Sequence, residues 1–256
     1  MSREADCNQS VIFAPRRRCR YGRRTRGMRE SFADCIALME ALVEYRQRPI
    51  SNDLQQIRHK YSMLHLDVLT LIYYFAATSM GNILEIGPYR GGSTISAALG
   101  LRASGIERKL ITIEPGGRHQ HHRLPSKDIL RDLKKNLAKQ RVADLVTLIP
   151  GYSWEEKTIA EVRTQLEPHS VALLMIDADG EVKRDLSVYG DLLVEGCNVV
   201  VDDYVSLKSG GKDLATRPQI DELVASEELQ ALGVYGWGTW VGRWWGRKSN
   251  AETLTF

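Results

Sequence analysis

Short apolar runs alternate with stretches of helical spacing along most of this chain. Five runs have the length of a buried strand, namely residues 83–86, 110–113, 145–149, 171–176 and 197–201. Helical spacing predicts helices over residues 93–103, 126–139, 181–194 and 218–232, with Gly196 as the end of the third. Strands that alternate with helices in this way predict an α/β fold with a parallel sheet.

The regions on either side of this alternation have their own patterns. Before the first strand, apolar spacing predicts helices over about residues 30–45, 53–59 and 62–77, with Asn52 or Asp53 as the N-cap of the second. The methionines of this region fit core-facing positions: Met39, Met63 and Met80. Near the end, the run V-Y-G-W-G-T-W-V-G-R-W-W predicts an antiparallel hairpin of two strands.

The hairpin is rich in tryptophan, which fits three roles. These side chains could pack against the sheet, form a subunit interface or provide a platform for a sugar, and packing or an interface is the favoured interpretation. The interface interpretation leaves a homodimer open. The residues concerned are Trp237, Trp240, Trp244 and Trp245.

Composition narrows the class of protein. The 256 residues are 43% hydrophobic and 26% charged, which is ordinary for one globular core. No run approaches the roughly 18 apolar residues that span a bilayer, and no apolar stretch follows the basic start as in a secretory leader. We therefore expect a cytoplasmic protein without membrane contact. The four cysteines are scattered, which indicates neither a zinc site nor a disulfide framework.

The basic charge is concentrated at the beginning of the chain. Residues 1–27 hold eight arginines against Glu4 and Asp6, a local charge of +6, whereas the whole chain carries +3. We interpret this segment as a disordered tail, with RNA binding or organelle targeting as alternatives. A nucleic-acid partner is not expected, because the arginine-rich run contains one Tyr and has little periodicity.

The most informative stretch is Asn82 to Thr94, N-I-L-E-I-G-P-Y-R-G-G-S-T, which predicts a strand, a glycine-rich turn and a helix. Glu85 precedes the first glycine, Gly87, by two residues. A carboxylate there would repel a phosphate, and the spacing G-x-x-x-G-G differs from the G-x-G-x-x-G turn of dinucleotide folds. The turn therefore suits a cationic ligand.

The segment E-I-G-P-Y-R-G-G resembles the first motif of class I S-adenosylmethionine-dependent methyltransferases, which bind the amino-acid end of the cofactor there. The resemblance implies a Rossmann-like, seven-stranded and mostly parallel sheet with helices on both faces, and it covers about residues 60–247. An NAD-dependent oxidoreductase is the alternative. The implied cofactor residues in the turn are Glu85, Gly87, Pro88, Tyr89, Gly91 and Ser93.

Two later segments agree with a nucleoside cofactor. Glu114 follows the second strand, where an acid can accept hydrogen bonds from a ribose diol. After the third strand, the resemblance places Gly151, Tyr152 and Ser153 near the adenine ring. Ser153 also fits an N-cap that forms a capping box with Glu156. Both roles are compatible.

Acids follow the fourth and fifth strands. D-A-D-G begins at Asp177, and D-D-Y contains Asp202 and Asp203. Because parallel strands end at one edge of a sheet, these carboxylates are expected to converge and repel one another. Raised pKa values or a hard divalent cation would relieve the repulsion, and an oxygen-only set favours magnesium or calcium. Solvated acids without a metal are the alternative.

This arrangement resembles the divalent-metal-dependent O-methyltransferases of the caffeoyl-CoA, catechol, macrolide-sugar and rhamnosyl types. The resemblance implies Asp177, Asp202 and Asp203 as metal ligands, with Asp177 also at the catalytic and cofactor sites. Relatives place Lys or His three residues after the first metal Asp, where this chain has Gly180. The general base is therefore open among several candidates: His119, His121, His122, Asp179, Lys183 and Lys212.

The histidines of the loop after Glu114 have two alternatives to a role as base. They could be solvated loop residues, or they could bind a metal, although no acid or cysteine spacing supports a metal site.

The sequence thus predicts a methyltransferase that methylates a small-molecule hydroxyl, with a sugar or glycoside as the first guess for the acceptor. A nucleic-acid methyltransferase or RNA binder that uses the arginine-rich tail is a further alternative. The predicted division of the chain is a basic tail (1–27), packing helices (28–80), the methyltransferase domain (81–247) and a C-terminal tail (248–256).

Overall fold

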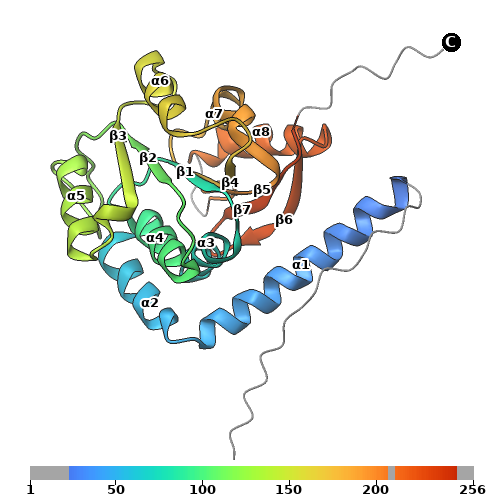
Figure 1. Ribbon diagram of the computed structural model, residues 1–256, viewed down its shortest axis with the longest axis horizontal. Helices are drawn as coiled ribbons and strands as arrows, with labels where there is room; N and C mark the ends of the chain where they lie inside the picture. Colours follow the sequence, from blue (N-terminus) through green and yellow to red (C-terminus); the bar gives the residue numbers. More distant parts are fainter. Residues whose placement is uncertain (1–22, 207–210, 247–256) are drawn as a thin grey trace, which may run out of the picture.

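The computed structural model describes residues 23–206 and 211–246. Within these residues, seven strands form one sheet in the order β3-β2-β1-β4-β5-β7-β6. Strand β7 runs in the direction opposite to the other six. Figure 1 shows β3 and β6 at its two edges. The strands are β1 (Asn82–Ile86), β2 (Leu110–Glu114), β3 (Val146–Pro150), β4 (Val171–Ile176), β5 (Leu193–Val201), β6 (Leu229–Tyr235) and β7 (Thr239–Trp244).

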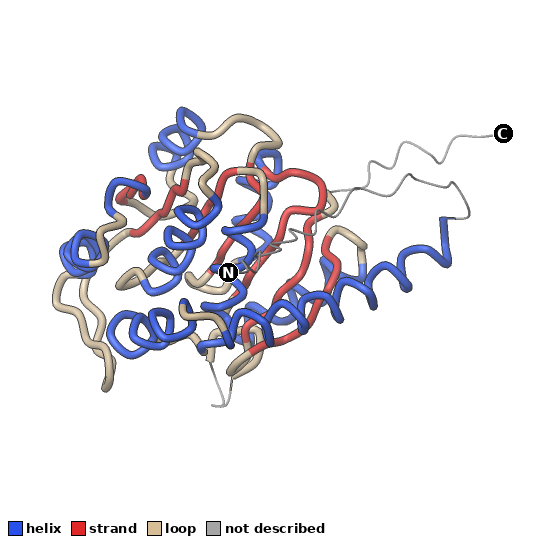
Figure 2. Tube along the Cα trace, turned by 60° about the horizontal axis from the view of Figure 1, so that its bottom comes forward, coloured by secondary structure: helices blue, strands red, loops and turns tan. Residues whose placement is uncertain are grey.

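Helices cover both faces of the sheet, as Figures 1 and 2 show. On one face lie α1 (Arg23–Gln47), α2 (Ile50–Tyr61), α3 (Leu66–Thr78), α4 (Gly92–Ser104) and α5 (Ile129–Lys139). On the other lie α6 (Glu156–Gln165), α7 (Val182–Tyr189) and α8 (Asp213–Ala225). This arrangement confirms the predicted Rossmann-like α/β fold and the C-terminal hairpin.

Two apolar cores hold the layers together because the central strands are buried on both faces. In β1, Ile83 packs into the core under α3 and α4, whereas Leu84 packs into the core under α7 and α8. The next strand repeats this alternation with Leu110 and Ile111. Side chains of a strand point alternately to its two faces, so a continuous apolar run is what a sheet covered on both sides requires.

Several predicted boundaries were wrong near the ends of helices. The helix predicted over residues 181–194 is α7, which ends at Tyr189 with Gly190 as its C-cap. A 3₁₀ turn follows, and Gly196 lies inside β5, which begins at Leu193. The predicted helix over 218–232 is α8, which begins at Asp213 and contains Pro218, and the chain re-enters the sheet at Leu229. Tertiary pairing with β7 decided this last segment, because Leu229 pairs with Trp244.

Corrections also apply to the N-terminal helices. α2 begins at Ile50 after Pro49, so neither Asn52 nor Asp53 caps it; proline suits a helix start because the first N–H groups are unpaired anyway. α1 begins at Arg23, inside the predicted 1–27 tail. Residues 1–22 and 248–256 lie outside the described residues.

Two of the three methionines predicted for the core are exposed. Met39 is 60% exposed and Met80 75% exposed, whereas Met63 is half-buried. α1 contacts the body through Leu38 and Tyr45, and Met39 lies on its outer side. Figure 2 shows α1 running alongside the last strands with its first turns extending beyond the body.

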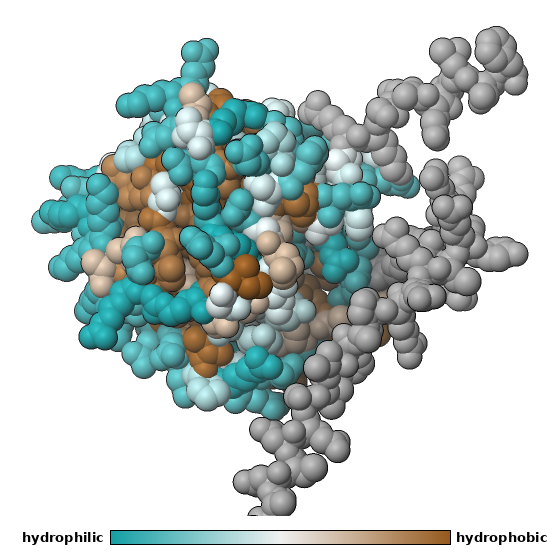
Figure 3. All heavy atoms as spheres, in the orientation of Figure 1, coloured by the Kyte–Doolittle hydropathy of each residue, from teal (hydrophilic) through white to brown (hydrophobic). Residues whose placement is uncertain are grey.

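The surface carries mixed side chains. On the face shown in Figure 3, apolar atoms are visible over the region of β2 and β3 among hydrophilic ones. No helix within residues 23–206 and 211–246 has the length and apolar character needed to cross a bilayer.

Candidate active site

The glycine turn after β1 lies where the strand order reverses, between β1 and β4. Gly87 donates its N–H to the carbonyl of Ile113 in β2 at 3.0 Å. Its φ is 84°, and a Cβ there would lie 2.2 Å from the carbonyl oxygen of Asp177. Only glycine tolerates this approach at a positive φ. The turn therefore lies in the crevice where open α/β sheets bind their ligands.

One pocket joins the end of β1 to the acids that follow β4 and β5. It also contains apolar side chains from β1, β4 and β5, including Ile86, Met175 and Val200. Its polar lining residues, which include four of the residues predicted from sequence to bind cofactor or metal, are Glu85, Ser93, Asp177, Asp202 and Thr239.

Glu85 is the buried acid of this pocket, with 1% of its surface exposed. Its Oε2 accepts a hydrogen bond from the Thr94 hydroxyl at 2.6 Å, whereas Oε1 has no partner among the described residues. Burial raises the pKa of the Glu85 carboxyl, and hydrogen bonds with Ser93 and Thr94 only partly oppose this. Burial of a carboxylate costs free energy when one of its oxygens has no hydrogen-bond partner. Glu85 is therefore suited to bind a cationic group that donates a hydrogen bond.

Glu114 ties the glycine turn to the end of β2. Its Oε2 accepts the backbone N–H of Tyr89 at 3.1 Å, and its Oε1 accepts that of Gly116 at 2.9 Å. Burial raises the pKa of the Glu114 carboxyl, and these two hydrogen bonds partly oppose the rise. Each carboxylate oxygen can accept a second hydrogen bond, so Glu114 keeps capacity for a diol at this edge.

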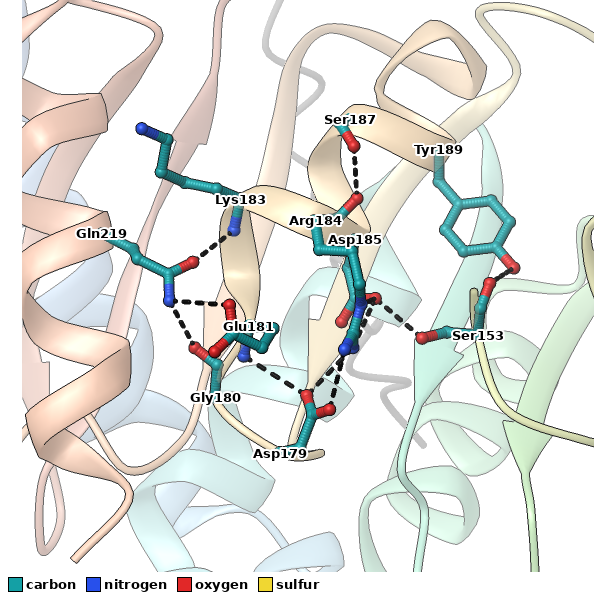
Figure 4. A network of polar contacts seen from close by, with 10 residues as sticks. All are labelled: Ser153, Asp179, Gly180, Glu181, Lys183, Arg184, Asp185, Ser187, Tyr189 and Gln219. Carbon is teal, nitrogen blue, oxygen red and sulfur yellow. Dashed lines mark hydrogen bonds and ion pairs between the residues drawn. The ribbon is translucent and has the colours of Figure 1, made fainter. Parts of the chain in front are cut away.

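The loop after β3 is fastened to the loop after β4 by what we call the Arg184 network, which is visible in Figure 4. Arg184 donates two hydrogen bonds to Asp179, at 2.8 and 2.9 Å, and a third to Asp185 at 3.1 Å. Asp185 also accepts the Ser153 hydroxyl at 2.7 Å, and the Tyr189 hydroxyl donates to the Ser153 carbonyl at 2.6 Å. The network consists of Ser153, Asp179, Arg184, Asp185 and Tyr189.

This network corrects the predicted capping role of Ser153. α6 begins at Glu156 after Glu155, and the Ser153 hydroxyl bonds Asp185 instead of a helix N–H. The adjacent Tyr152 and Trp154 are 46% and 41% exposed, with ring centroids 4.6 Å apart. The Arg184 guanidinium lies 4.1 Å from the centre of the Trp154 ring. Sequence reasoning missed Trp154 and Arg184, because no local pattern links residues so far apart in the chain.

The three predicted metal ligands do converge. One carboxylate oxygen from each of Asp177, Asp202 and Asp203 lies within 4.8 Å of the others, and this is the only such group found among residues 23–206 and 211–246. Thr239 on β7 donates a hydrogen bond to Asp202 at 2.5 Å. Asp203 has φ 57°, a backbone conformation that costs about 1–2 kcal/mol for a residue with a Cβ.

Burial and crowding both affect the pKa values of these acids. Burial, followed by the charge of Asp202, raises the pKa of the Asp177 carboxyl well above its usual range. Burial also raises the pKa of Asp202, although the hydrogen bond from Thr239 opposes this. The set contains only carboxylate oxygens, which suits a hard divalent cation. The ammonium of Lys212 lies beside it, 3.3 Å from Asp203 and 3.8 Å from Asp177.

The histidine loop lies against the glycine turn. The ring of His119 is 5.3 Å from that of Tyr89, and His121 and His122 have ring centroids 4.3 Å apart. The Nδ1 of His121 accepts the backbone N–H groups of Arg123 and Leu124, both at 3.2 Å. No metal-binding group that includes a histidine was found in the described ranges.

Two of the other candidate bases, Asp179 and Lys183, are paired with residues outside the carboxylate cluster. Asp179 accepts two hydrogen bonds from Arg184. Burial by itself would raise the pKa of the Asp179 carboxyl, but the hydrogen bonds from Arg184 outweigh burial, so the pKa is lowered. Lys183 donates to Glu222 on α8 at 2.6 Å. Gly180, at the position where relatives have a base, faces α8, and a Cβ there would lie 3.0 Å from the Thr216 hydroxyl oxygen.

Comparison with known proteins agrees with this geometry. Residues 84–204, from β1 to just beyond β5, match a sequence family described as a methyltransferase domain. No curated protein sequence gives a significant match.

Solved structures share the fold at low identity. One is assigned as a caffeoyl-CoA O-methyltransferase from Staphylococcus aureus, with TM-score 0.57, 17% identity, and coverage of 83% of this chain and 99% of that one. A second is the O-methyltransferase TomG from Streptomyces achromogenes, involved in tomaymycin synthesis, with TM-score 0.52, 19% identity, and 86% and 99% coverage. A third is the Podospora anserina methyltransferase PaMTH1 bound to SAH, with TM-score 0.53, 17% identity, and 88% and 98% coverage. These likenesses confirm the predicted class I methyltransferase fold.

Proposed function

We propose that this chain, whose residues 84–204 match a methyltransferase-domain family, transfers the methyl group of S-adenosylmethionine to a hydroxyl of a small molecule. The observation that carries the proposal is Glu85, a buried carboxylate with an unpartnered oxygen, in a pocket with Gly87 and Asp177. The bound cofactor supplies a methyl carbon made electrophilic by the sulfonium. A cationic amino-acid end fits this acid, whereas the pyrophosphate of NAD would be repelled.

Four of the predicted cofactor residues have a proposed task in this arrangement. Glu85 would bind the ammonium of the cofactor, and Glu114 would orient the ribose diol with its remaining lone pairs. Tyr152 and Ser153 would border the adenine ring on a loop that the Arg184 network fixes in place. Rigid placement of these groups aligns acceptor oxygen, methyl carbon and sulfur, which is the main requirement of such a displacement.

We also propose that Asp177, Asp202 and Asp203 hold a divalent cation, most simply magnesium. Their convergence, their oxygen-only chemistry and the raised pKa values of Asp177 and Asp202 support a site that gains from added positive charge. The cation would supply Lewis acidity that favours the ionised acceptor hydroxyl. The chain's own contribution is to hold Asp177 and Asp202 at the pocket that contains Glu85, so that the acceptor and cofactor sites adjoin.

The proposed acceptors are small molecules with hydroxyl groups, including sugars and glycosides. TomG is involved in tomaymycin synthesis, and the Staphylococcus aureus protein is assigned as a caffeoyl-CoA O-methyltransferase. The first panel of acceptors therefore consists of catechols, caffeoyl esters and glycosides with neighbouring hydroxyls. Which group takes the proton from the acceptor is part of the same test. His119 and its neighbours lie against Tyr89 of the glycine turn and are the histidines to substitute first.

The experiment measures transfer of a radiolabelled methyl group from S-adenosylmethionine to this panel, with magnesium or with EDTA. Calorimetry with S-adenosylmethionine, S-adenosylhomocysteine and NAD accompanies it. Label in an extractable product that EDTA prevents supports the whole proposal. Binding of NAD in place of the sulfur nucleosides would refute it, and transfer that persists in EDTA would remove the metal from it.

Quaternary structure belongs to the proposal as well. Trp237 lies just before β7 and Trp245 just after it, and they are 44% and 42% exposed, which supports a homodimer through the β6–β7 hairpin. Light scattering after gel filtration measures the mass directly. A value near the monomer mass of 28.9 kDa would contradict the dimer.

A further inference from the structure

Lys212 is the one ammonium that contacts the three-carboxylate cluster among the described residues. Its Nζ lies 3.3 Å from a carboxylate oxygen of Asp203 and 3.8 Å from one of Asp177. Its side chain is 48% exposed, so the ammonium reaches the cluster from the solvent side. A cation of the chain itself therefore lies beside the carboxylates that would bind a divalent ion.

The backbone of Lys212 is fixed by the first turn of α8. Its carbonyl accepts the N–H groups of Ala215 and Thr216 at 2.9 and 3.0 Å. Gln219, one turn further along α8, donates to the carbonyl of Gly180 at 3.2 Å and accepts the N–H of Lys183 at 2.8 Å (Figure 4). α8 is thus fastened to the loop after β4, which begins with Asp177. The position of Lys212 beside the acids follows from helix packing.

The positive charge of Lys212 is favourable beside the carboxyl groups, but it does not match their number. The ammonium of Lys212 is within ion-pair distance of both Asp203 and Asp177, so its positive charge faces two of the three acids. One ammonium supplies a single positive charge to a group of three carboxyl side chains. The cluster therefore keeps an attraction for a further cation while Lys212 is present.

We propose that Lys212 is a displaceable counter-ion, which pairs with Asp203 and Asp177 in the metal-free protein and moves out when a divalent cation binds. Its flexible four-carbon stem allows this movement without displacement of α8. The lysine competes with the cation, so it sets the concentration at which the site fills. This inference rests on the metal site of the proposed function.

The size of the competition follows from the exposure of the pair. Ion pairs that are about half exposed contribute at most about 1 kcal/mol, so the loss of this competitor is expected to tighten metal binding about 3- to 5-fold. Arginine in the same place keeps the charge and can pair with two carboxylate oxygens. Lys212→Arg is therefore expected to bind the cation no more tightly than the unchanged protein.

The test titrates Mn²⁺ into the full-length protein and follows the signal of free Mn²⁺ by electron paramagnetic resonance, which needs no acceptor and no turnover. Lys212→Met is compared with Lys212→Arg and with Lys183→Met. The last removes the same charge from a pair with Glu222 on the outside of α8 and serves as the matched control. Thermal unfolding in EDTA and in Mn²⁺ is recorded for each protein.

The expected result is tighter Mn²⁺ binding in Lys212→Met alone, with a lower melting temperature in EDTA and a larger rise on adding Mn²⁺. Equal affinity, within twofold, in Lys212→Met and the unchanged protein would overturn the inference while leaving the metal site standing. Absence of Mn²⁺ binding in every protein would overturn the metal site and the inference with it. If Lys212→Met does not fold, tighter binding by Lys212→Arg than by the unchanged protein overturns the inference, and equal or weaker binding supports it.

Discussion

Replacement of Glu85 by glutamine tests the proposed binding of a cationic cofactor most directly. The substitution keeps the shape of the side chain and an oxygen for the Thr94 hydroxyl, but it removes the charge and places an amide group where the unpartnered Oε1 now lies. A hydrogen bond between charged groups contributes about 1.5–3 kcal/mol, which corresponds to roughly 10- to 150-fold in the dissociation constant. We expect that loss in affinity for S-adenosylmethionine.

The same loss appears in thermal unfolding. At about 100 times the dissociation constant of the unchanged protein, the cofactor adds about 2.7 kcal/mol of stability, or roughly 5–10 °C for a chain of this size. At that concentration Glu85→Gln is expected to gain only about 0.3–1.3 kcal/mol, or roughly 1–5 °C. Differential scanning fluorimetry measures both shifts, and Glu161→Gln on the exposed face of α6 is the control.

Without cofactor the substitution should change the pH dependence in a defined direction. The pKa of Glu85 is raised in the folded protein, so its protonated form is the better tolerated one. Its contribution to stability is present below the unfolded pKa and is lost as the pH rises through the folded pKa. Cofactor-free Glu85→Gln should therefore lose less stability between acid and neutral pH than the unchanged protein. Equal cofactor shifts in the two proteins would refute the role of Glu85.

Three further predictions concern the same edge of the sheet. Gly87→Ala places a Cβ 2.2 Å from the Asp177 carbonyl and should destabilise the fold by about 2–4 kcal/mol. Gly105→Ala is the control, because Gly105 has a similar positive φ, 65°, but open space around it. A larger loss of melting temperature for Gly87→Ala than for Gly105→Ala would show the effect of the clash, and equal losses would contradict it. Glu114→Gln should weaken S-adenosylhomocysteine binding about 10-fold in calorimetry, because its amide nitrogen meets the N–H of Tyr89 or Gly116; unchanged affinity would remove Glu114 from the ribose site. Asp202→Asn or excess EDTA should abolish methyl transfer while cofactor binding persists, and activity that survives both would exclude the metal.

The predictions from sequence succeeded where a local pattern carries the information. The apolar run of β4 was predicted with the bounds that the structure shows, because a strand covered on both faces must be continuously apolar. An acid after an apolar run marks the carboxyl end of a strand, and parallel strands bring such ends together, so Asp177, Asp202 and Asp203 could be placed at one site.

Helix ends were harder to predict, because competing partners decide them. Gly196 looked like a C-cap, yet Leu193 already pairs with Val171 of β4, so the strand begins before this glycine. Ser153 looked like an N-cap, yet its hydroxyl finds Asp185, which is 1% exposed and needs a donor. In each case a long-range contact outcompeted a local motif.

The class of fold, the glycine turn with its acid and the edge of the sheet where the acids gather could all be predicted from sequence, because these depend on residue type and on the period of side chains along a strand. The contacts of those groups depend on the tertiary structure. Among the described residues, one oxygen of Glu85 has no partner, the loop of Ser153 is fastened through Arg184, and Lys212 at the start of α8 lies beside the carboxylates. Such contacts arise from the packing of helices against the sheet, and packing joins residues whose distance along the chain gives no indication that they touch.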